Sequence, residues 1–334
     1  MAKHSVLVIG CGSIGERHLR CFLTTDRAEV TACDANPALL QRMAETYKVP
    51  VAADWQIALQ AKFDAVIICT PANLHVPMAT SALVAGSHVL VEKPLSHSLV
   101  GVDELIRTRD RTGRQVAVAY VLHVYALLAA AREFLRHGEF GPVRQATVVT
   151  GQSFPFFRPA YAQTYYRDRR TGGGAIQDAL THSVNWVESI LGPADSVLCD
   201  CAHLVLPNVE VEDTVHVSAR HGAALSTFAL NQFQQPNETT LQFNAAHGSV
   251  KIELHQQRWG TFAAGAADWT WHSVSAGERD TPFIAQANAF LDQLEGQPSR
   301  LCTLEAAAQT LRFNLAALAS AASGQRVACA SLHA

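Results

Sequence analysis

The sequence predicts an α/β protein with two parts: an N-terminal doubly wound parallel sheet of the Rossmann type, and a C-terminal α+β domain with a large, open, mainly antiparallel sheet. Two observations carry this prediction. Over the first part of the chain, short apolar runs alternate with longer amphipathic segments, which is the pattern of βαβ units. Further along, the pattern changes to two-residue periodicity, which is typical of strands with one buried face.

Length and composition narrow the class of protein. The chain has 334 residues, and single hydrophobic cores usually stop growing at roughly 250 to 300 residues, so we expect two domains. Hydrophobic residues make up 49% and charged residues 16%, with a net charge of −3, which gives no indication of nucleic-acid binding. No apolar run approaches the roughly 20 residues that span a membrane. The opening "MAKHSVLVIG" lacks the regions of a signal peptide, so we expect a cytoplasmic protein without a membrane partner.

The N-terminal strands and helices follow from the spacing of apolar residues. The strands are mostly apolar on both sides, as in parallel sheets that helices cover on both faces. The helical segments carry apolar residues at helical spacing, with Gly or Asn marking one of their ends. The predicted strands are residues 5–10, 29–34, 64–70, 87–92 and 115–120, and the clearest helices are 36–48 and 98–113.

The C-terminal elements begin with an amphipathic helix over residues 122–141 that ends at glycine. Four strands then alternate apolar and polar residues, and "AHGS" at 246–249 predicts a hairpin turn between the last two. Two further amphipathic helices close the chain. The predicted strands are 213–219, 224–230, 239–245 and 249–254, and the helices are 283–296 and 304–324.

The first chemical motif is "GCGSIG", which follows the first strand directly and matches G-x-G-x-x-G. Gly10 permits the turn, Gly12 lets a pyrophosphate approach the backbone, and Gly15 allows the helix to pack closely on the strand. Ser13 and Ile14 open that helix, whose free N–H groups and positive dipole end attract phosphates. Three glycines also occur in ordinary tight loops, but the strand–turn–helix context favours dinucleotide binding.

Asp34 ends the second strand, 19 residues beyond Gly15, where a carboxylate accepts hydrogen bonds from ribose hydroxyls. The same charge repels a 2′-phosphate, so the sequence favours NAD over NADP. The alternative is that Asp34 caps the helix that follows.

Two further motifs, "TPANLH" and "EKP", follow predicted strands, and their loops should face the cofactor because ligands bind beyond the carboxyl ends of parallel strands. A glycine-rich turn, then T-P-x-x-x-H, then E-K-P resembles the Gfo/Idh/MocA oxidoreductase family, which glucose–fructose oxidoreductase and inositol dehydrogenase typify. His75 equally fits a helix cap. The resemblance implies cofactor contacts from Thr70, Pro71, Asn73, His75, Glu92 and Lys93.

The resemblance continues at "GGGAIQDALTH", where Asp178 and His182 are four residues apart. A helix that starts after the glycines would place both side chains on one face. From the residues alone, a glycine hinge, an unrelated histidine or a metal site also remain open. The closing segment is similar to the family's C-terminal helix, so the likeness covers essentially the whole chain.

The resemblance implies an NAD-binding Rossmann domain over residues 1–121 and a domain over 122–334 for substrate binding and oligomerisation, in a homodimer or homotetramer. It further implies hydride transfer between nicotinamide C4 and a hydroxyl-bearing carbon of a sugar, sugar derivative or cyclitol. Lys93 would bind the reacting oxygen, His182 would exchange its proton, and Asp178 would hold substrate or lysine. An imidazole with a pKa of about 6.5 suits that exchange, and an ammonium stabilises a developing alkoxide.

Several positions depart from the family pattern. Asn185 stands where many relatives have an acid, so one polyol contact is in doubt. Tyr120 and His123 lie in a stretch that is more apolar than usual, and both are expected to contact substrate. "FPFFRPAYAQTYYRDRR" adds Arg158 and Tyr165 as further substrate contacts. The arginines at 167, 169 and 170 also fit a solvated charge run.

Alternatives to a simple dehydrogenase remain. A redox-neutral, NAD-dependent glycosidase would share the same glycines, lysine and histidine, and a non-catalytic NAD-binding regulator would share the fold. "CDCAH" places Cys199, Cys201 and His203 at alternate positions, as in a zinc site, but no fourth ligand is evident and an ordinary sheet face is favoured. The eight cysteines are expected to be reduced thiols, and no metal is expected.

Overall fold

A computed structural model describes residues 3–275 and 277–332. The chain forms two compact units, of which the first combines residues 3–124 with 277–307 and the second combines 125–275 with 308–332. Within these residues no helix is both long and apolar enough to cross a membrane.

The first unit is built on sheet A, whose strands run in the order β15-β6-β5-β4-β1-β2-β3. All pairs are parallel except β15 with β6. The five predicted strands of this region are present, which confirms the doubly wound parallel sheet. The strands are β1 His4–Ile9, β2 Ala28–Cys33, β3 Val51–Ala52, β4 Ala65–Ile68, β5 His88–Val91, β6 Val116–Val118 and β15 Cys302–Thr303.

Helices cover sheet A on both faces, as the apolar character of its strands requires. Strands β4 and β5 are buried almost completely. Both helices predicted here form, at α2 and α5, and glycines with positive φ precede and follow α5. The helices are α1 Ser13–Thr24, α2 Pro37–Tyr47, α3 Trp55–Ala58, α4 His75–Val84, α5 Val102–Thr112 and α9 Thr281–Leu294.

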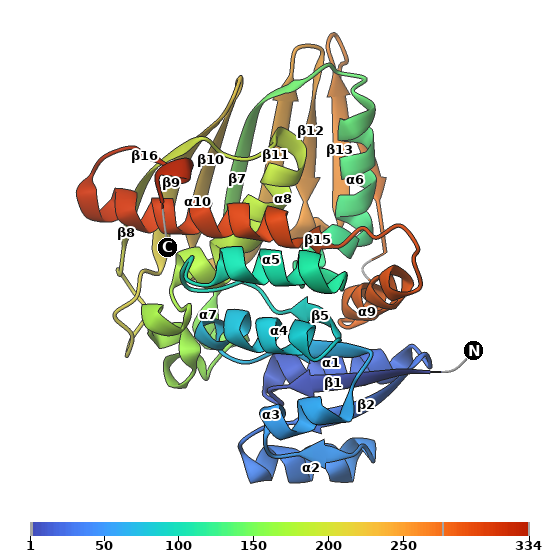
Figure 1. Ribbon diagram of the computed structural model, residues 1–334. Coiled ribbons are helices and arrows are strands. Elements are labelled where there is room, and N and C mark those ends of the chain that lie inside the picture. The colour runs from blue at the N-terminus through green and yellow to red at the C-terminus, as the bar shows by residue number, and fades with distance from the viewer. Residues whose placement is uncertain (1–2, 276, 333–334) are drawn as a thin grey trace. The chain divides into compact units, whose positions relative to one another are not determined.

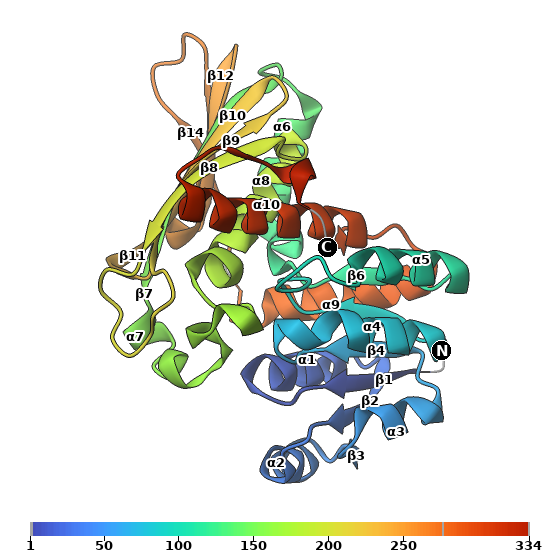
Figure 2. The same ribbon diagram turned by 60° about the vertical axis from the view of Figure 1, so that its left-hand side comes forward.

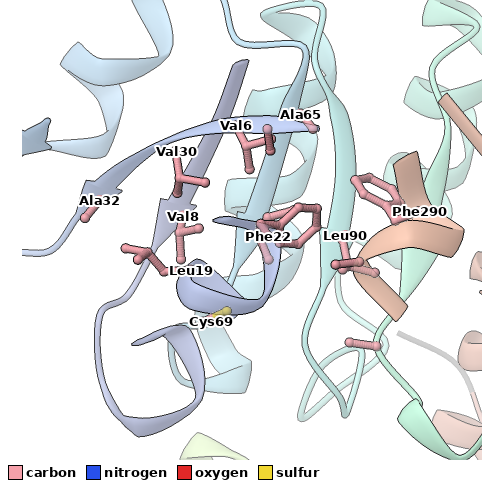
Figure 3. Close-up of a cluster of buried hydrophobic side chains, with 14 of the residues drawn as sticks. Val6, Val8, Leu19, Phe22, Val30, Ala32, Ala65, Cys69, Leu90 and Phe290 are labelled. Carbon is pink, nitrogen blue, oxygen red and sulfur yellow. The ribbon is translucent and has the colours of Figure 1, made fainter. Parts of the chain in front are cut away.

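Helix α9 is distant in sequence from the rest of the first unit but completes its core (Figure 3). Phe290 on α9 meets Phe22 on α1 edge to face, with ring centroids 6.4 Å apart. Both rings are fully buried in the cluster that includes Val8 and Leu90. A segment near the C-terminus is therefore part of the core beneath the glycine-rich turn.

The second unit is built on sheet B, with strands in the order β14-β13-β12-β11-β7-β10-β9-β8-β16. Its neighbours are antiparallel except β7 with β10, which confirms the mainly antiparallel sheet. The predicted hairpin is present, with Ala245 paired to Gly248. The strands are β7 Val143–Ser153, β8 Ser196–Ala202, β9 Thr214–His221, β10 Ala224–Asn231, β11 Phe233–Ala245, β12 Gly248–Glu253, β13 Arg258–Ala263, β14 Thr270–Ser273 and β16 Val327–Ala328.

Three helices of the second unit, α6 Ala126–His137, α8 Thr181–Leu191 and α10 Leu304–Ser323, lie on one face of sheet B (Figures 1 and 2). Each helix contributes one aromatic ring that contacts an aromatic ring of the sheet. The ring pairs are Phe134 with Trp259, Trp186 with Phe243, and Phe313 with Phe228. These contacts bury one face of the sheet, as the two-residue periodicity predicts.

Residues 154–171, which follow β7, had no predicted structure, and they fold as helix α7 Phe154–Phe157 followed by three single 3₁₀ turns. Its aromatic side chains form a core of their own. Phe154, Tyr161 and Tyr166 are buried together with Leu206. The segment is therefore an ordered part of the second unit, with Phe156 and Phe157 exposed at its surface.

A polar network joins α8 to α10 inside the second unit. Thr310 Oγ1 donates a 2.7 Å hydrogen bond to Glu188 Oε2 and accepts one of 2.9 Å from Asn185 Nδ2. Burial raises the pKa of Glu188 to about 6, although hydrogen bonds from Thr310, Ala194 and Gln309 oppose the shift. Ionised Glu188 therefore lowers the stability of the folded state at neutral pH.

This network predicts a pH-dependent gain of stability for Glu188→Gln. Because the carboxyl pKa is higher in the folded than in the unfolded chain, wild-type stability falls as pH rises from 4.5 to about 6. The unfolding free energy of the variant relative to wild type should therefore rise by about 1 to 2 kcal/mol between pH 4 and pH 7.5. Urea unfolding at each pH measures it. Exposed Glu139→Gln is the matched control, and equal profiles for the two variants would contradict the prediction.

Candidate active site

The glycine-rich turn after β1 has room for a side chain at only one of its three motif positions. Gly10 has φ +90°, and a Cβ there would lie 2.8 Å from the carbonyl carbon of Cys69. A Cβ on Gly15 would overlap the carbonyl oxygen of Gly10. A Cβ on Gly12 would meet nothing within 4 Å. The turn thus combines close packing at its two ends with open space at its centre.

Helix α1 begins at Ser13, directly beside that open space, and no side chain caps its N-terminus. The backbone N–H groups of its first turn, which include those of Ser13 and Ile14, are the donors that a phosphate uses at a helix start. Open space over Gly12 and an uncapped helix end fit a pyrophosphate. These residues therefore fit NAD, which the sequence predicts here.

Asp34 follows β2 and lies beside the glycine-rich turn. Its Oδ2 accepts a 2.7 Å hydrogen bond from the Cys11 N–H, and its Oδ1 accepts one of 2.8 Å from the Asn36 N–H. Asn36, not Asp34, caps helix α2, because its side chain accepts from the Ala38 N–H. The capping alternative for Asp34 is therefore wrong.

The "TPANLH" and "EKP" loops follow β4 and β5, which pair with each other next to β1. His75 joins the two loops, since its ring nitrogens lie 2.7 Å from the Thr70 carbonyl oxygen and 2.9 Å from that of Pro94. Burial lowers the pKa of His75, while these hydrogen bonds and the charge of Glu92 oppose the shift. His75 also begins α4, so its contacts are explained without a ligand, and its contact with NAD stays a prediction.

Lys93 follows Glu92 at the carboxyl end of β5, and the Lys93–Pro94 peptide bond is cis. The glycine-rich turn follows β1 at the same edge of sheet A, with only β4 between β1 and β5. Tyr120 and His123 come after β6 at that edge, and both are buried. The structure therefore gathers the predicted residues of the first unit along one edge of one sheet.

In the second unit, helical backbone begins after the glycines, as predicted, but its first turn differs from the expected geometry. Residues Ile176–Leu180 form a π-helical turn that leads into α8. A π turn holds more residues than an α turn, and such turns often occur at functional sites. Asp178 lies in this turn and is 2% exposed, while His182 lies in the first turn of α8.

The carboxylate of Asp178 is held by two residues of the preceding aromatic segment. Tyr165 Oη donates a 2.6 Å hydrogen bond to Asp178 Oδ1, and Arg158 Nη1 lies 3.7 Å from Oδ2. The structure thus brings together three of the residues that the sequence predicts as substrate contacts. Since both carboxylate oxygens face protein partners, Asp178 is placed to orient neighbouring groups.

Glu212 is a buried carboxylate that sequence reasoning missed. Its Oε2 accepts a 3.0 Å hydrogen bond from Arg169 Nε and lies 2.8 Å from Arg169 Nη2, and its Oε1 accepts a 3.1 Å hydrogen bond from the Ile176 N–H. Gly174, with φ +92°, has no room for a Cβ because the Glu212 carboxylate lies against it. Glu212 therefore anchors the start of the helical segment that carries Asp178 and His182.

The arginines before the glycines thus differ from one another. Arg169 pairs with buried Glu212, whereas Arg170, with a side chain 89% exposed, pairs with Asp168 at the surface. The solvated charge run that the sequence allowed fits Arg170, whereas Arg169 is 53% exposed but also pairs with a buried carboxylate. Asn185, which stands where many relatives have an acid, donates a hydrogen bond to Thr310 inside the second unit. This departure from the family pattern therefore has a structural role.

The possible zinc ligands near Cys199 do not lie on one strand. Cys199 and Cys201 alternate on β8, but His203 follows the strand, and its ring lies 2.6 Å from the Leu206 carbonyl oxygen. Over residues 3–275 and 277–332, no group of three or more His, Cys, Asp or Glu side chains is placed to hold a metal ion.

The neighbouring arginines allow a matched test of the Glu212 anchor. Arg169→Ala leaves the buried carboxylate without its guanidinium and should lower the unfolding free energy by about 2 kcal/mol, a value reduced for the half-exposed arginine. Arg170→Ala removes only a surface pair and should cost less than about 0.5 kcal/mol. Urea denaturation measures both values. Equal losses would show that Arg169 does not stabilise this region beyond a surface pair.

Comparison with known proteins matches both units. Residues 4–120 match the model described as "Oxidoreductase family, NAD-binding Rossmann fold", and residues 128–251 match the GFO/IDH/MocA C-terminal domain. Together the two models match most of the chain.

Curated relatives and solved structures are similar as well. Inositol 2-dehydrogenase of Rhizobium meliloti (strain 1021) is 25% identical over 186 residues, 55% of this chain and 54% of the relative. A glycosyl hydrolase family 109 protein of Shewanella amazonensis is 32% identical over 126 residues, 34% of this chain and 28% of the relative. The chain spans about half the length of the first curated relatives it matches.

A levoglucosan dehydrogenase solved in complex with NADH and levoglucosan shares the fold, with a TM-score of 0.88 and 18% identity over 98% of this chain and 99% of that one. The matched models, the two sheets and the glycine-rich turn agree, and the chain belongs to the Gfo/Idh/MocA family of NAD-binding oxidoreductases.

Proposed function

We propose that this protein is an NAD-dependent oxidoreductase that transfers hydride between nicotinamide C4 and a hydroxyl-bearing carbon of a sugar, sugar derivative or cyclitol. One observation carries the proposal: Lys93 and the glycine-rich turn lie at the same edge of sheet A, separated by one strand. A cationic side chain at the edge where a dinucleotide binds suits an oxygen that becomes negative during reaction.

The relatives support this class of substrate by their names. One is an inositol 2-dehydrogenase, and another was solved with NADH and the sugar derivative levoglucosan. Both names describe a dehydrogenase. In the present chain, we assign cofactor binding to residues 1–121 and substrate binding to residues 122–334, of which 277–307 pack with the first unit.

The proposed chemistry gives each group one role. When bound, NAD supplies the hydride acceptor, and Gly12, Asp34 and the start of α1 would hold it. Lys93 donates a hydrogen bond to the reacting oxygen and stabilises its negative charge. His182 takes the hydroxyl proton, as an imidazole can near neutral pH. Asp178, fixed by Tyr165 and Arg158, orients the substrate.

A redox-neutral glycosidase is the second candidate, favoured by the likeness to a glycosyl hydrolase family 109 protein. It would use the same groups to oxidise a sugar transiently, break the glycosidic bond and return the hydride. Incubation with aryl glycosides separates the two candidates. Release of the aglycone without net NADH formation would replace the dehydrogenase proposal with this one.

We further infer a homodimer or homotetramer that packs through the face of sheet B opposite its helices. Val149, Leu198 and Leu225 are exposed there on β7, β8 and β10, at positions that alternate with buried residues. Sedimentation equilibrium measures the assembly, and a monomer at micromolar concentration would contradict it.

The cofactor proposal predicts a preference for NAD over NADP. The Asp34 carboxylate accepts from ribose hydroxyls and repels a 2′-phosphate, so wild type should bind NAD at least about tenfold more tightly. Asp34→Asn removes the charge but keeps an amide oxygen for a backbone N–H. The dissociation constant for NADP divided by that for NAD should therefore be lower in this variant than in wild type. Fluorescence titration with both cofactors measures it. Tighter binding of NADP by wild type would overturn the role of Asp34.

The activity proposal predicts a turnover that depends on Lys93. Sugars, inositols, sugar acids and glycosides are screened with NAD by the absorbance of reduced nicotinamide. On an active substrate, Lys93→Ala should lower kcat by about 100-fold or more, because the alkoxide loses its stabilising charge. Exposed Lys62→Ala is the matched control and should retain wild-type kcat. An unchanged kcat in Lys93→Ala would place the catalytic group elsewhere, and no turnover by wild type on any compound would favour a regulator.

A further inference from the structure

A buried histidine–carboxylate contact joins two elements of the first unit that are far apart in sequence. His18 on α1 lies with its Nε2 2.7 Å from Oε1 of Glu92, which follows β5. The two residues are 1% and 6% exposed. Helix α1 begins at the glycine-rich turn, and Glu92 directly precedes Lys93. The pair therefore connects the helix that would hold phosphate to the loop that carries the lysine.

The second oxygen of Glu92 continues the connection. Its Oε2 accepts a 3.0 Å hydrogen bond from the backbone N–H of Lys93. Burial tends to raise the pKa of Glu92, but the hydrogen bond from His18 and the charges of His18, Lys93 and His75 hold it below its usual value. Glu92 is thus a carboxylate at neutral pH, with one oxygen on the helix side and one on the lysine loop.

Aromatic packing fixes His18 from its other side. The His18 ring meets Phe283 on α9 edge to face, with centroids 5.9 Å apart. The Arg17 guanidinium lies over the same Phe283 ring, 4.8 Å from its centroid. Since α9 also packs on α1 through Phe290, His18 has little freedom to move away from Glu92.

The chain on the other side of Lys93 is also held by a buried histidine. The His75 ring contacts the Pro94 carbonyl oxygen at 2.9 Å and is 1% exposed. Lys93 therefore stands between two fixed points, the Glu92 carboxylate before it and the Pro94 carbonyl after it. Its backbone is tied to α1 on one side and to the start of α4 on the other.

We infer that His18 and Glu92 are positioning residues for Lys93, which hold the lysine loop at a fixed place relative to the glycine-rich helix. This inference rests on the proposed function, because it takes Lys93 as the group that faces cofactor and substrate. It gives Glu92 a role through Lys93, with no contact of its own to the reacting atoms. A displacement of about 1 Å between reacting groups can lower a rate about 100-fold, so such a bridge matters for catalysis.

The chain has only five lysines, at positions 3, 48, 62, 93 and 251, so Lys93 can be observed directly. Reductive methylation with ¹³C-formaldehyde gives each lysine a dimethylamine resonance, and Lys93→Arg assigns the one that disappears. Addition of NAD to the methylated wild-type chain should shift the Lys93 resonance. Glu92 is buried and both of its oxygens contact protein groups, so we expect no direct contact with NAD, unlike what the family resemblance implies. In Glu92→Ala, NAD should therefore still bind within about threefold of the wild-type dissociation constant, while the shift falls below half.

Two more variants keep the test decisive. Glu92→Gln retains an amide oxygen for the Lys93 N–H and should recover part of the NAD-induced shift, even if Glu92→Ala folds poorly. His88→Gln is the control, because His88 begins β5, at the end of the strand opposite Glu92. The Nδ1 atom of His88 accepts a hydrogen bond from the Gln115 N–H, and this variant should leave the shift unchanged. On an active substrate, kcat should fall about 10- to 100-fold in Glu92→Ala, with the KM for NAD little affected.

The outcomes separate the two proposals. If NAD binds the wild-type chain without moving the Lys93 resonance, the proposed role of Lys93 fails. If the resonance moves in wild type and moves equally in Glu92→Ala and Glu92→Gln, the lysine assignment stands and the bridge is refuted. A lower melting temperature with an unchanged shift and kcat would reduce His18 and Glu92 to residues that stabilise the fold.

Discussion

The close approach of helix α1 to strands β1 and β4 is the constraint on which the first unit depends. No Cβ fits at Gly15 without overlap with the Gly10 carbonyl oxygen, and none fits at Gly10 beside Cys69. This approach sets the start of α1 next to the open space at Gly12. It also brings the next turn of the helix near enough to β5 for His18 to reach Glu92. Backbone packing therefore determines where charged side chains can meet.

Each unit uses a buried carboxylate to fix the segment that carries candidate catalytic residues. In the first unit, Glu92 accepts hydrogen bonds from the Lys93 backbone and the His18 ring. In the second unit, Glu212 accepts hydrogen bonds from the Ile176 backbone and the Arg169 guanidinium. Removal of one partner leaves a buried charge uncompensated, which is strongly unfavourable. Such pairs hold one local geometry more firmly than apolar contacts, which tolerate small shifts.

The sequence predicted those parts of the structure that depend on local patterns. The parallel strands, the glycine-rich turn and the place of Lys93 at a strand end follow from periodicity and from short motifs. The role of Glu212 was not predictable, because its partners Arg169 and Ile176 are about 40 residues away and the residues around it form no motif. Helix α9 was predicted as a helix, but an amphipathic pattern does not identify the core that the helix joins. The π turn at Asp178 also has no sequence signal that distinguishes it from an α turn.

The return of α9 and β15 to the first unit makes that unit discontinuous in sequence. Residues 3–124 contain the glycine-rich turn and six of the strands of sheet A. Phe290 and β15, which pairs with the outer side of β6, come from residues 277–307. During synthesis at about 5 to 20 residues per second, roughly 8 to 30 seconds separate the emergence of these two portions. Over that interval Phe22 and the free edge of β6 lack their final partners. The apolar surface of the nascent cofactor-binding half therefore stays uncovered until nearly the whole of the other half has been translated.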